Sequence, residues 1–119
     1  MDVLDDLPSG GADEGRGMLQ LVHSVAPAAS LSFATAFNSE SSFAQNILDL
    51  RTAGADVIVD DISYFAEPFF QEGPVANAVA TVTAAGASYI SSAGNRRHIE
   101  LGPAVRRSVL HKRCQFAEC

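Results

Sequence analysis

Basic residues are scarce in this chain of 119 residues. Its 8 Lys and Arg stand against 14 Asp and Glu, which gives a formal net charge of −6 at pH 7. Such an acidic balance argues against binding to nucleic acid or to an anionic membrane surface. The balance is uneven, because residues 1–95 carry 12 acids and 2 bases whereas residues 96–119 carry 2 acids and 6 bases.

Cysteine and long apolar runs are also scarce. The 2 cysteines, Cys114 and Cys119, make a poor zinc site at their spacing, so no metal is predicted. No run approaches the ~18 apolar residues of a membrane helix. The start, MDVLDDLPSGG, lacks the basic and apolar parts of a signal peptide, and the cellular location stays open. No glycine-rich phosphate loop follows a predicted strand, so no nucleotide cofactor is expected either.

What the chain does contain is typical of a globular domain. Hydrophobic residues make up 47% of it and charged residues 18%, with a mean hydropathy of +0.11. This composition excludes a disordered chain, and the length allows at most one domain with a modest core.

Three helices are predicted, near residues 14–24, 40–53 and 74–85. Asp13 and Ser39 are suitable caps for the first two, and Pro74 is suited to start the third. The residues expected to face inward follow the helical period: Met18, Leu21, Val22 and Val25, then Phe43, Ile47, Leu48 and Leu50, then Val75, Val79 and Val82.

Strands are predicted near residues 31–36, 56–60 and 88–92. Their alternation with helices favours an α/β fold, a three-layer doubly wound parallel sheet with right-handed crossovers. In such sheets the functional crevice lies beyond the carboxyl ends of the strands. Polar residues gather at those ends, among them Asn38, Asp60, Asp61 and Asn95.

Three stretches resemble segments of the subtilisin-like serine peptidases, or subtilases. EGRGMLQLVHSVAP resembles the His-Gly-Thr helix that leads to Ala-Pro; DVIVDDIS resembles the strand that lines the substrate cleft; SYISSAGN resembles the strand that ends in Ala-Gly-Asn. The resemblance covers residues 13–95, a partial catalytic domain. Residues 1–12 are then a lead-in, and residues 96–119 form an unmatched basic tail. We expect that tail to be loosely attached, with a helix from Ala104 to Lys112.

The resemblance places Glu14 where the family has its catalytic histidine, with Gly15 after it. A carboxylate can act as a general base if burial or a neighbouring acid raises its pKa. The related sedolisin-type peptidases pair such a Glu with an Asp four residues on, but Met18 stands there. The alternative is that Asp13 and Glu14 only complement the positive end of the helix.

Other site residues also follow from the resemblance. Asn95 would donate to the oxyanion, although Gly94-Asn95 could instead be a simple turn. Asp61, Ile62 and Ser63 would border the substrate through backbone atoms. Adjacent carboxylates on a strand point to opposite faces, so Asp60 and Asp61 cannot act as an acid/base pair.

Several residues are weaker candidates. His23 lies about 13 Å along the helix from Glu14, which favours a structural histidine. His98 and His111 lie outside the resemblance. The aromatic residues of the loop after the second strand could line substrate subsites or cap the core; they are Tyr64, Phe65, Phe69 and Phe70.

Two parts of the family's machinery are not found. No Gly-Thr-Ser motif carries a nucleophile, since Ser88 of Gly86-Ala87-Ser88 lies at a strand start. No strand is predicted in MDVLDDLPSGGA that would present the triad aspartate. The hypothesis is therefore a fragment of a serine endopeptidase, inactive alone, whose relatives act on peptides or proteins. The alternative is a non-catalytic α/β module that binds a peptide or protein.

Overall fold

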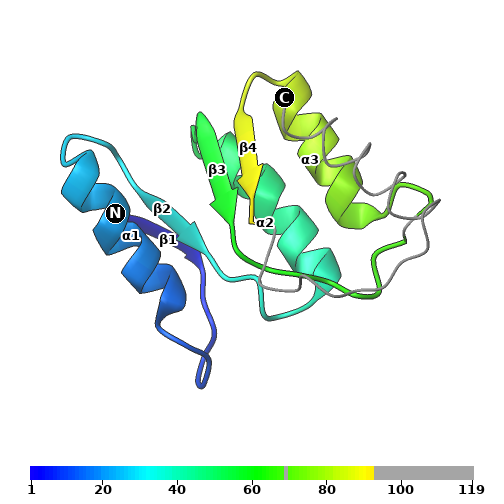
Figure 1. The fold of residues 1–119 in the computed structure, drawn as a ribbon, viewed down its shortest axis with the longest axis horizontal. Coiled ribbons are helices and arrows are strands. Elements are labelled where there is room, and N and C mark those ends of the chain that lie inside the picture. Colours follow the sequence, from blue (N-terminus) through cyan, green and yellow to red (C-terminus); the bar gives the residue numbers. More distant parts are fainter. Residues whose placement is uncertain (69, 93–119) are drawn as a thin grey trace.

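A computed structural model describes residues 1–68 and 70–92. Strands and helices alternate along this part of the chain (Figure 1). The elements are β1 (Asp2–Asp5), α1 (Glu14–Val25), β2 (Ser32–Ala34), α2 (Glu40–Thr52), β3 (Val57–Asp60), α3 (Pro74–Ala84) and β4 (Ser88–Ser91). The three predicted helices and three predicted strands are all present, with bounds close to those expected.

Strand β1 corrects the prediction that the first residues hold no strand. It has only four residues, DVLD, and this apolar pair between two acids is too short to show a strand period. These residues form a strand because they pair in parallel with β2. The Asp2 N–H donates to the Leu31 carbonyl at 2.9 Å, and the Thr35 N–H donates to the Asp5 carbonyl at 3.0 Å.

The described strands form two parallel pairs, β1 with β2 and β3 with β4. The register of the second pair runs from Val57 opposite Ser88 to Asp60 opposite Ser91. The chain is therefore a small α/β domain with three helices and short parallel strands in two two-stranded sheets.

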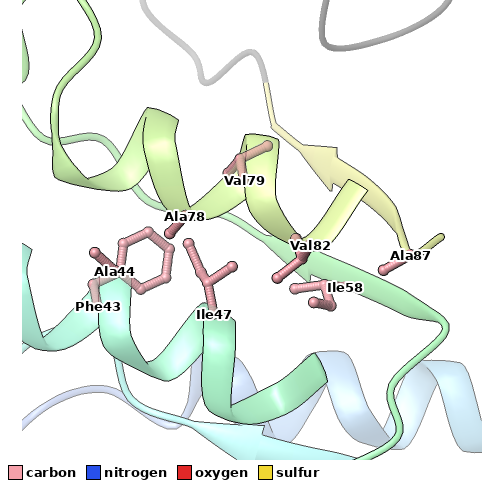
Figure 2. Packing of buried hydrophobic residues seen from close by; sticks show 8 residues of the cluster. All are labelled: Phe43, Ala44, Ile47, Ile58, Ala78, Val79, Val82 and Ala87. Carbon is pink, nitrogen blue, oxygen red and sulfur yellow. The ribbon is translucent and has the colours of Figure 1, made fainter. Parts of the chain in front are cut away.

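The core lies where α2 and α3 pack on each other and on the β3–β4 pair (Figure 2). Ile47 and Val82 are each only 1% exposed and lie at its centre. The buried hydrophobic residues are Phe43, Ala44, Ile47, Ile58, Ala78, Val79, Val82 and Ala87. The inward faces predicted for α2 and α3 are thus confirmed, with Leu48, Leu50 and Val75 packed at the edge of this cluster.

The inward face predicted for α1 is wrong for three of its four residues. No residue of α1 is buried; Met18 is half-buried, whereas Leu21, Val22 and Val25 are 70%, 45% and 87% exposed. The helix lies beside β1 and β2, away from α2 and α3 (Figure 1). The spacing of the apolar residues predicted the helix correctly, but this spacing does not indicate whether another layer covers its apolar face.

The helix ends follow local chemistry at α2 and α3. Ser39 caps α2 by accepting from the Ser42 N–H at 3.0 Å, and Pro74 starts α3 as predicted. The C-terminal turns pass through Gly54 and Gly86 at φ +99° and +93°, a conformation that favours glycine.

Asp13 departs from its predicted role in part. It is the residue before α1, but its side chain makes no capping hydrogen bond. Its carboxylate instead pairs with Arg16 at 3.2 Å, and both side chains are largely exposed. None of the described helices is long and apolar enough to cross a membrane.

Candidate functional site

Glu14 is the first residue of α1 and is exposed to solvent. Burial is one of the conditions under which a carboxylate can act as a base, and Glu14 does not meet it. A pocket of about 150 Å³ lies next to it, between the first turns of α1 and the strands β1 and β2. The charged residues that line this pocket are Asp6, Asp13 and Arg16.

Gly15 packs directly on β2. A Cβ atom at this position would lie 2.6 Å from Cε2 of Phe33, closer than real carbon atoms approach. At Gly17, two residues further along the helix, no atom lies within 4 Å of such a Cβ. The glycine that follows Glu14 is thus needed for the close approach of α1 to β2, whereas the second glycine is not.

Asp5, at the end of β1, was missed as a site residue. Its carboxylate accepts from Asn46 Nδ2 at 2.8 Å and from Asn38 Nδ2 at 3.1 Å. The Asn46 side chain is buried and also donates to the Thr35 carbonyl at 2.9 Å. These bonds, that from Asn46 above all, lower the pKa of Asp5. The available signal was that Asp5 follows the apolar pair Val3-Leu4, just as Asp60 follows an apolar strand.

Asp60 and Asp61 have separate partners, the first on β4 and the second just after it. The Asp60 carboxylate accepts from the Tyr89 hydroxyl and from Ser91 Oγ, the latter at 2.7 Å. The Asp61 carboxylate accepts from Ser92 Oγ. Burial, followed by the bond to Asp60, raises the pKa of Tyr89 far above its ordinary value.

The loop that begins at Asp61 is partly tied down. Ile62 is half-buried against the core, and its N–H points to Asp60 Oδ1 at 3.5 Å. Ser63 is exposed. Tyr64 packs on Phe43, with ring centroids 5.6 Å apart, and its hydroxyl donates to the carbonyls of Ala36 and Ser39. Tyr64 therefore caps the core.

The remaining aromatic residues of the loop are disposed differently. Phe65 and Phe70 are 59% and 73% exposed. Phe69 lies outside the described residues.

Other candidates lie apart from Glu14 or outside the described part. His23 is exposed in the last turn of α1, at the opposite end of that helix. Asn95, His98, His111, the two cysteines and the whole tail of residues 96–119 are outside the described residues. Within the described ranges no three His, Cys, Asp or Glu side chains are grouped to hold a metal ion.

Comparisons with known proteins gave no relative: no family model, curated protein or solved structure matches this chain.

Proposed function

We propose that the chain is a central fragment of a subtilisin-like serine endopeptidase that lacks its nucleophile. The observation that carries the proposal is the order β1, Asp5, α1. In the family that the sequence resembles, the triad aspartate ends a strand that precedes the helix of the catalytic base. Asp5 ends β1, and the next helix begins at Glu14, the position that matches that base.

The surroundings of Asp5 suit a triad aspartate. In the family such a residue stays ionised while it orients a histidine base. Here Glu14, itself a carboxylate, stands at the position of that base. Two asparagine side chains donate to Asp5 and lower its pKa, which keeps the carboxylate charged at neutral pH. In this proposal Glu14 marks the place of the base, Asn95 would donate to the oxyanion, and backbone atoms of residues 61–63 would border the peptide.

One face of the β3–β4 pair is not covered by residues 1–68 and 70–92, and this supports a fragment. Val59 and Ile90 are register partners and are 49% and 55% exposed, while Val57 on the same face is 58% exposed. Ile58 points the other way, into the core with α2 and α3. Because parallel sheets are normally covered on both faces, a further segment of the parent protein would cover this face. The three-layer doubly wound arrangement, with α1 on the side opposite α2 and α3, belongs to this proposal.

A non-catalytic peptide- or protein-binding module is the second candidate. The same exposed apolar face favours it, since a patch of this kind can dock a partner. The two candidates differ in their need for Asp5, because a binding face on β3 and β4 does not involve that carboxylate.

The test starts from the gene region that follows the codon of Asn95, read in all three frames. The proposal predicts a Gly-Thr-Ser motif at the start of a helix-period segment. Joined to residues 1–95, that segment should give a protein whose serine reacts with a fluorophosphonate probe, and alanine in place of that serine should abolish the labelling.

Asp5→Asn in the joined protein should slow labelling, because the site then loses the carboxylate that Asn38 and Asn46 hold in its charged form. Gln45→Ala, on the exposed side of α2, is the matched control and should leave the rate unchanged. The original chain should not react with the probe. Reaction of that chain, or no Gly-Thr-Ser motif in any frame, would contradict the proposal.

A further inference from the structure

The segment of residues 61–68, which follows β3, is held at two helix N-termini. At the first, the Tyr64 hydroxyl donates to the carbonyls of Ala36 and Ser39, just before α2. At the second, Glu67 Oε1 accepts from the Ala76 N–H in the first turn of α3, at 3.0 Å. The 61–68 segment therefore connects the starts of α2 and α3.

The Glu67 carboxylate is tightly enclosed at the start of α3. A Cβ atom on Gly73 would lie 2.5 Å from its carboxylate atoms, so any side chain at this position would have to displace the Glu67 carboxylate. Oε2 of Glu67 is buried and has no hydrogen-bond partner among the described residues. A buried acceptor without a donor is costly, so a donor close to Oε2 would be strongly favoured.

Glu40, the first residue of α2, is the group within reach. A side-chain hydrogen bond to Glu67 is the main cause that raises the pKa of Glu40. Two neighbouring ionised carboxylates repel each other, and neither can donate a hydrogen bond. If one of the two carries a proton, its O–H supplies the missing donor.

We propose that Glu40 and Glu67 share one proton, and that this Glu40–Glu67 latch fixes the 61–68 segment to the start of α2 in acid and releases it as the pH rises. The proton resides on Glu40. Glu67 Oε1 already accepts from the Ala76 N–H at the start of α3, so Glu67 is the acceptor of the pair.

Few other charges face the latch in the described part of the chain. From the 61–68 segment, Tyr64 is near Glu40, and burial raises the pKa of Tyr64, so its hydroxyl stays neutral in the relevant range. From α3 there is no charged side chain in the first turn. The hydrogen bond to Glu67, followed by burial and repulsion, raises the pKa of Glu40.

The sign of the pH effect follows from that direction. A carboxyl whose pKa is raised in the closed state contributes stability below its ordinary pKa, and this stability is lost as the pH rises through the raised pKa. If the proposed function holds, the latch would also control the start of the same segment, Asp61 to Ser63, where the peptide would lie. The latch itself requires no peptidase activity.

The experiment is amide hydrogen exchange on the full chain at about pH 4.5 and about pH 7.5, corrected for the intrinsic pH dependence of exchange. The amides of residues 61–67 should lose protection several-fold at the higher pH. Glu40→Gln should remove this loss, because a glutamine amide donates to Glu67 at both pH values. Glu72→Gln is the matched control, an exposed glutamate of the same connection, and should behave as the parent chain.

Equal protection of the parent at both pH values, or an unchanged pH dependence in Glu40→Gln, would overturn the latch. Should Glu40→Gln not fold, the carboxyl carbons of the parent can be titrated by NMR. The latch predicts that Glu40 titrates above the ordinary glutamate range. Titration of Glu40 within that range would overturn it. Probe labelling plays no part in either measurement, so the latch and the peptidase proposal can fail separately.

Discussion

The two parallel strand pairs of this molecule are built alike, but the helices that pack on them are buried very differently. In the first region, residues 2–34, α1 lies beside β1 and β2 and has no buried residue. In the second region, residues 40–91, α2 and α3 enclose a core with β3 and β4 that contains eight buried hydrophobic residues. Full burial of a large apolar side chain contributes about 1.5–3 kcal/mol, so stability must come mainly from the second region. A strand pair with one amphipathic helix does not make a core until another layer covers it.

The comparison bears on function, because Asp5 and Glu14 both lie in the less buried region. Asn46 is the main polar link between the regions, since it reaches from α2 to the Asp5 carboxylate and to the Thr35 carbonyl. Candidate catalytic groups held mainly by such a link would become rigid only when a larger domain is complete.

The largest difference between the regions should appear on truncating one apolar side chain in each. Ile47→Ala removes a side chain that is 1% exposed and should lower the free energy of unfolding by about 2–5 kcal/mol. Leu21→Ala removes one that is 70% exposed and should change it by less than about 0.5 kcal/mol. Urea unfolding followed by circular dichroism measures both, and similar losses would contradict the unequal cores.

Breaking the link between the regions should have the next largest effect. Asn46→Ala leaves the Thr35 carbonyl without this donor, and should cost about 1–3 kcal/mol. Amide exchange should show the greatest loss of protection in β1 and β2. Gln45→Ala, which removes only a bond to Asp49 within α2, should change little. Equal effects of the two variants would mean that Asn46 is not the link.

The two glycines of α1 test how closely this helix packs on β2 in the first region. Gly17→Ala meets no atom and should stabilise α1 by about 0.5–1 kcal/mol through helix propensity, seen as slower exchange of its amides. Gly15→Ala should give no such gain, because its Cβ must displace the Phe33 ring. A changed chemical shift of that ring would report the displacement. Equal stabilisation by both would show that α1 does not pack closely on β2.

The smallest expected effect is the pH dependence that Asp5 contributes. Its pKa is lowered in the folded chain, chiefly by Asn46, so the stabilisation is present above the ordinary aspartate pKa and is lost as the pH falls through the lowered value. Asp5→Asn should weaken the loss of stability between about pH 5 and about pH 2, measured as the urea midpoint. An unchanged acid dependence of stability in this variant would mean that Asp5 does not contribute to it.

The sequence predicted elements wherever a local period was long enough. The helices of residues 14–25, 40–52 and 74–84 showed apolar spacing and stop residues, and the Ser39 cap was correctly identified. Strand β1 could not be predicted, because DVLD becomes a strand only by pairing with β2, which is distant in the sequence. The exposure of Leu21 and Val25 was missed for a related reason, since a stripe does not state what covers it.

Some features of the candidate site could also be predicted from the sequence, and others could not. The separation of Asp60 from Asp61 followed from strand geometry alone. The bonds from Asn38 and Asn46 to Asp5 depend on tertiary packing across more than thirty residues, and no local pattern indicates them. Glu67 was missed likewise, because its importance arises from Ala76 and Gly73 at the start of α3.

Native-state hydrogen exchange, resolved by residue, tests the unequal regions most directly. Amides in α2, α3 and the β3–β4 pair should exchange only by global unfolding. Those in α1 and β1 should open locally and be protected at least about 100-fold less. Uniform protection across residues 2–91 would contradict the account, because it would mean that the region of Asp5 and Glu14 is as firmly folded as the core.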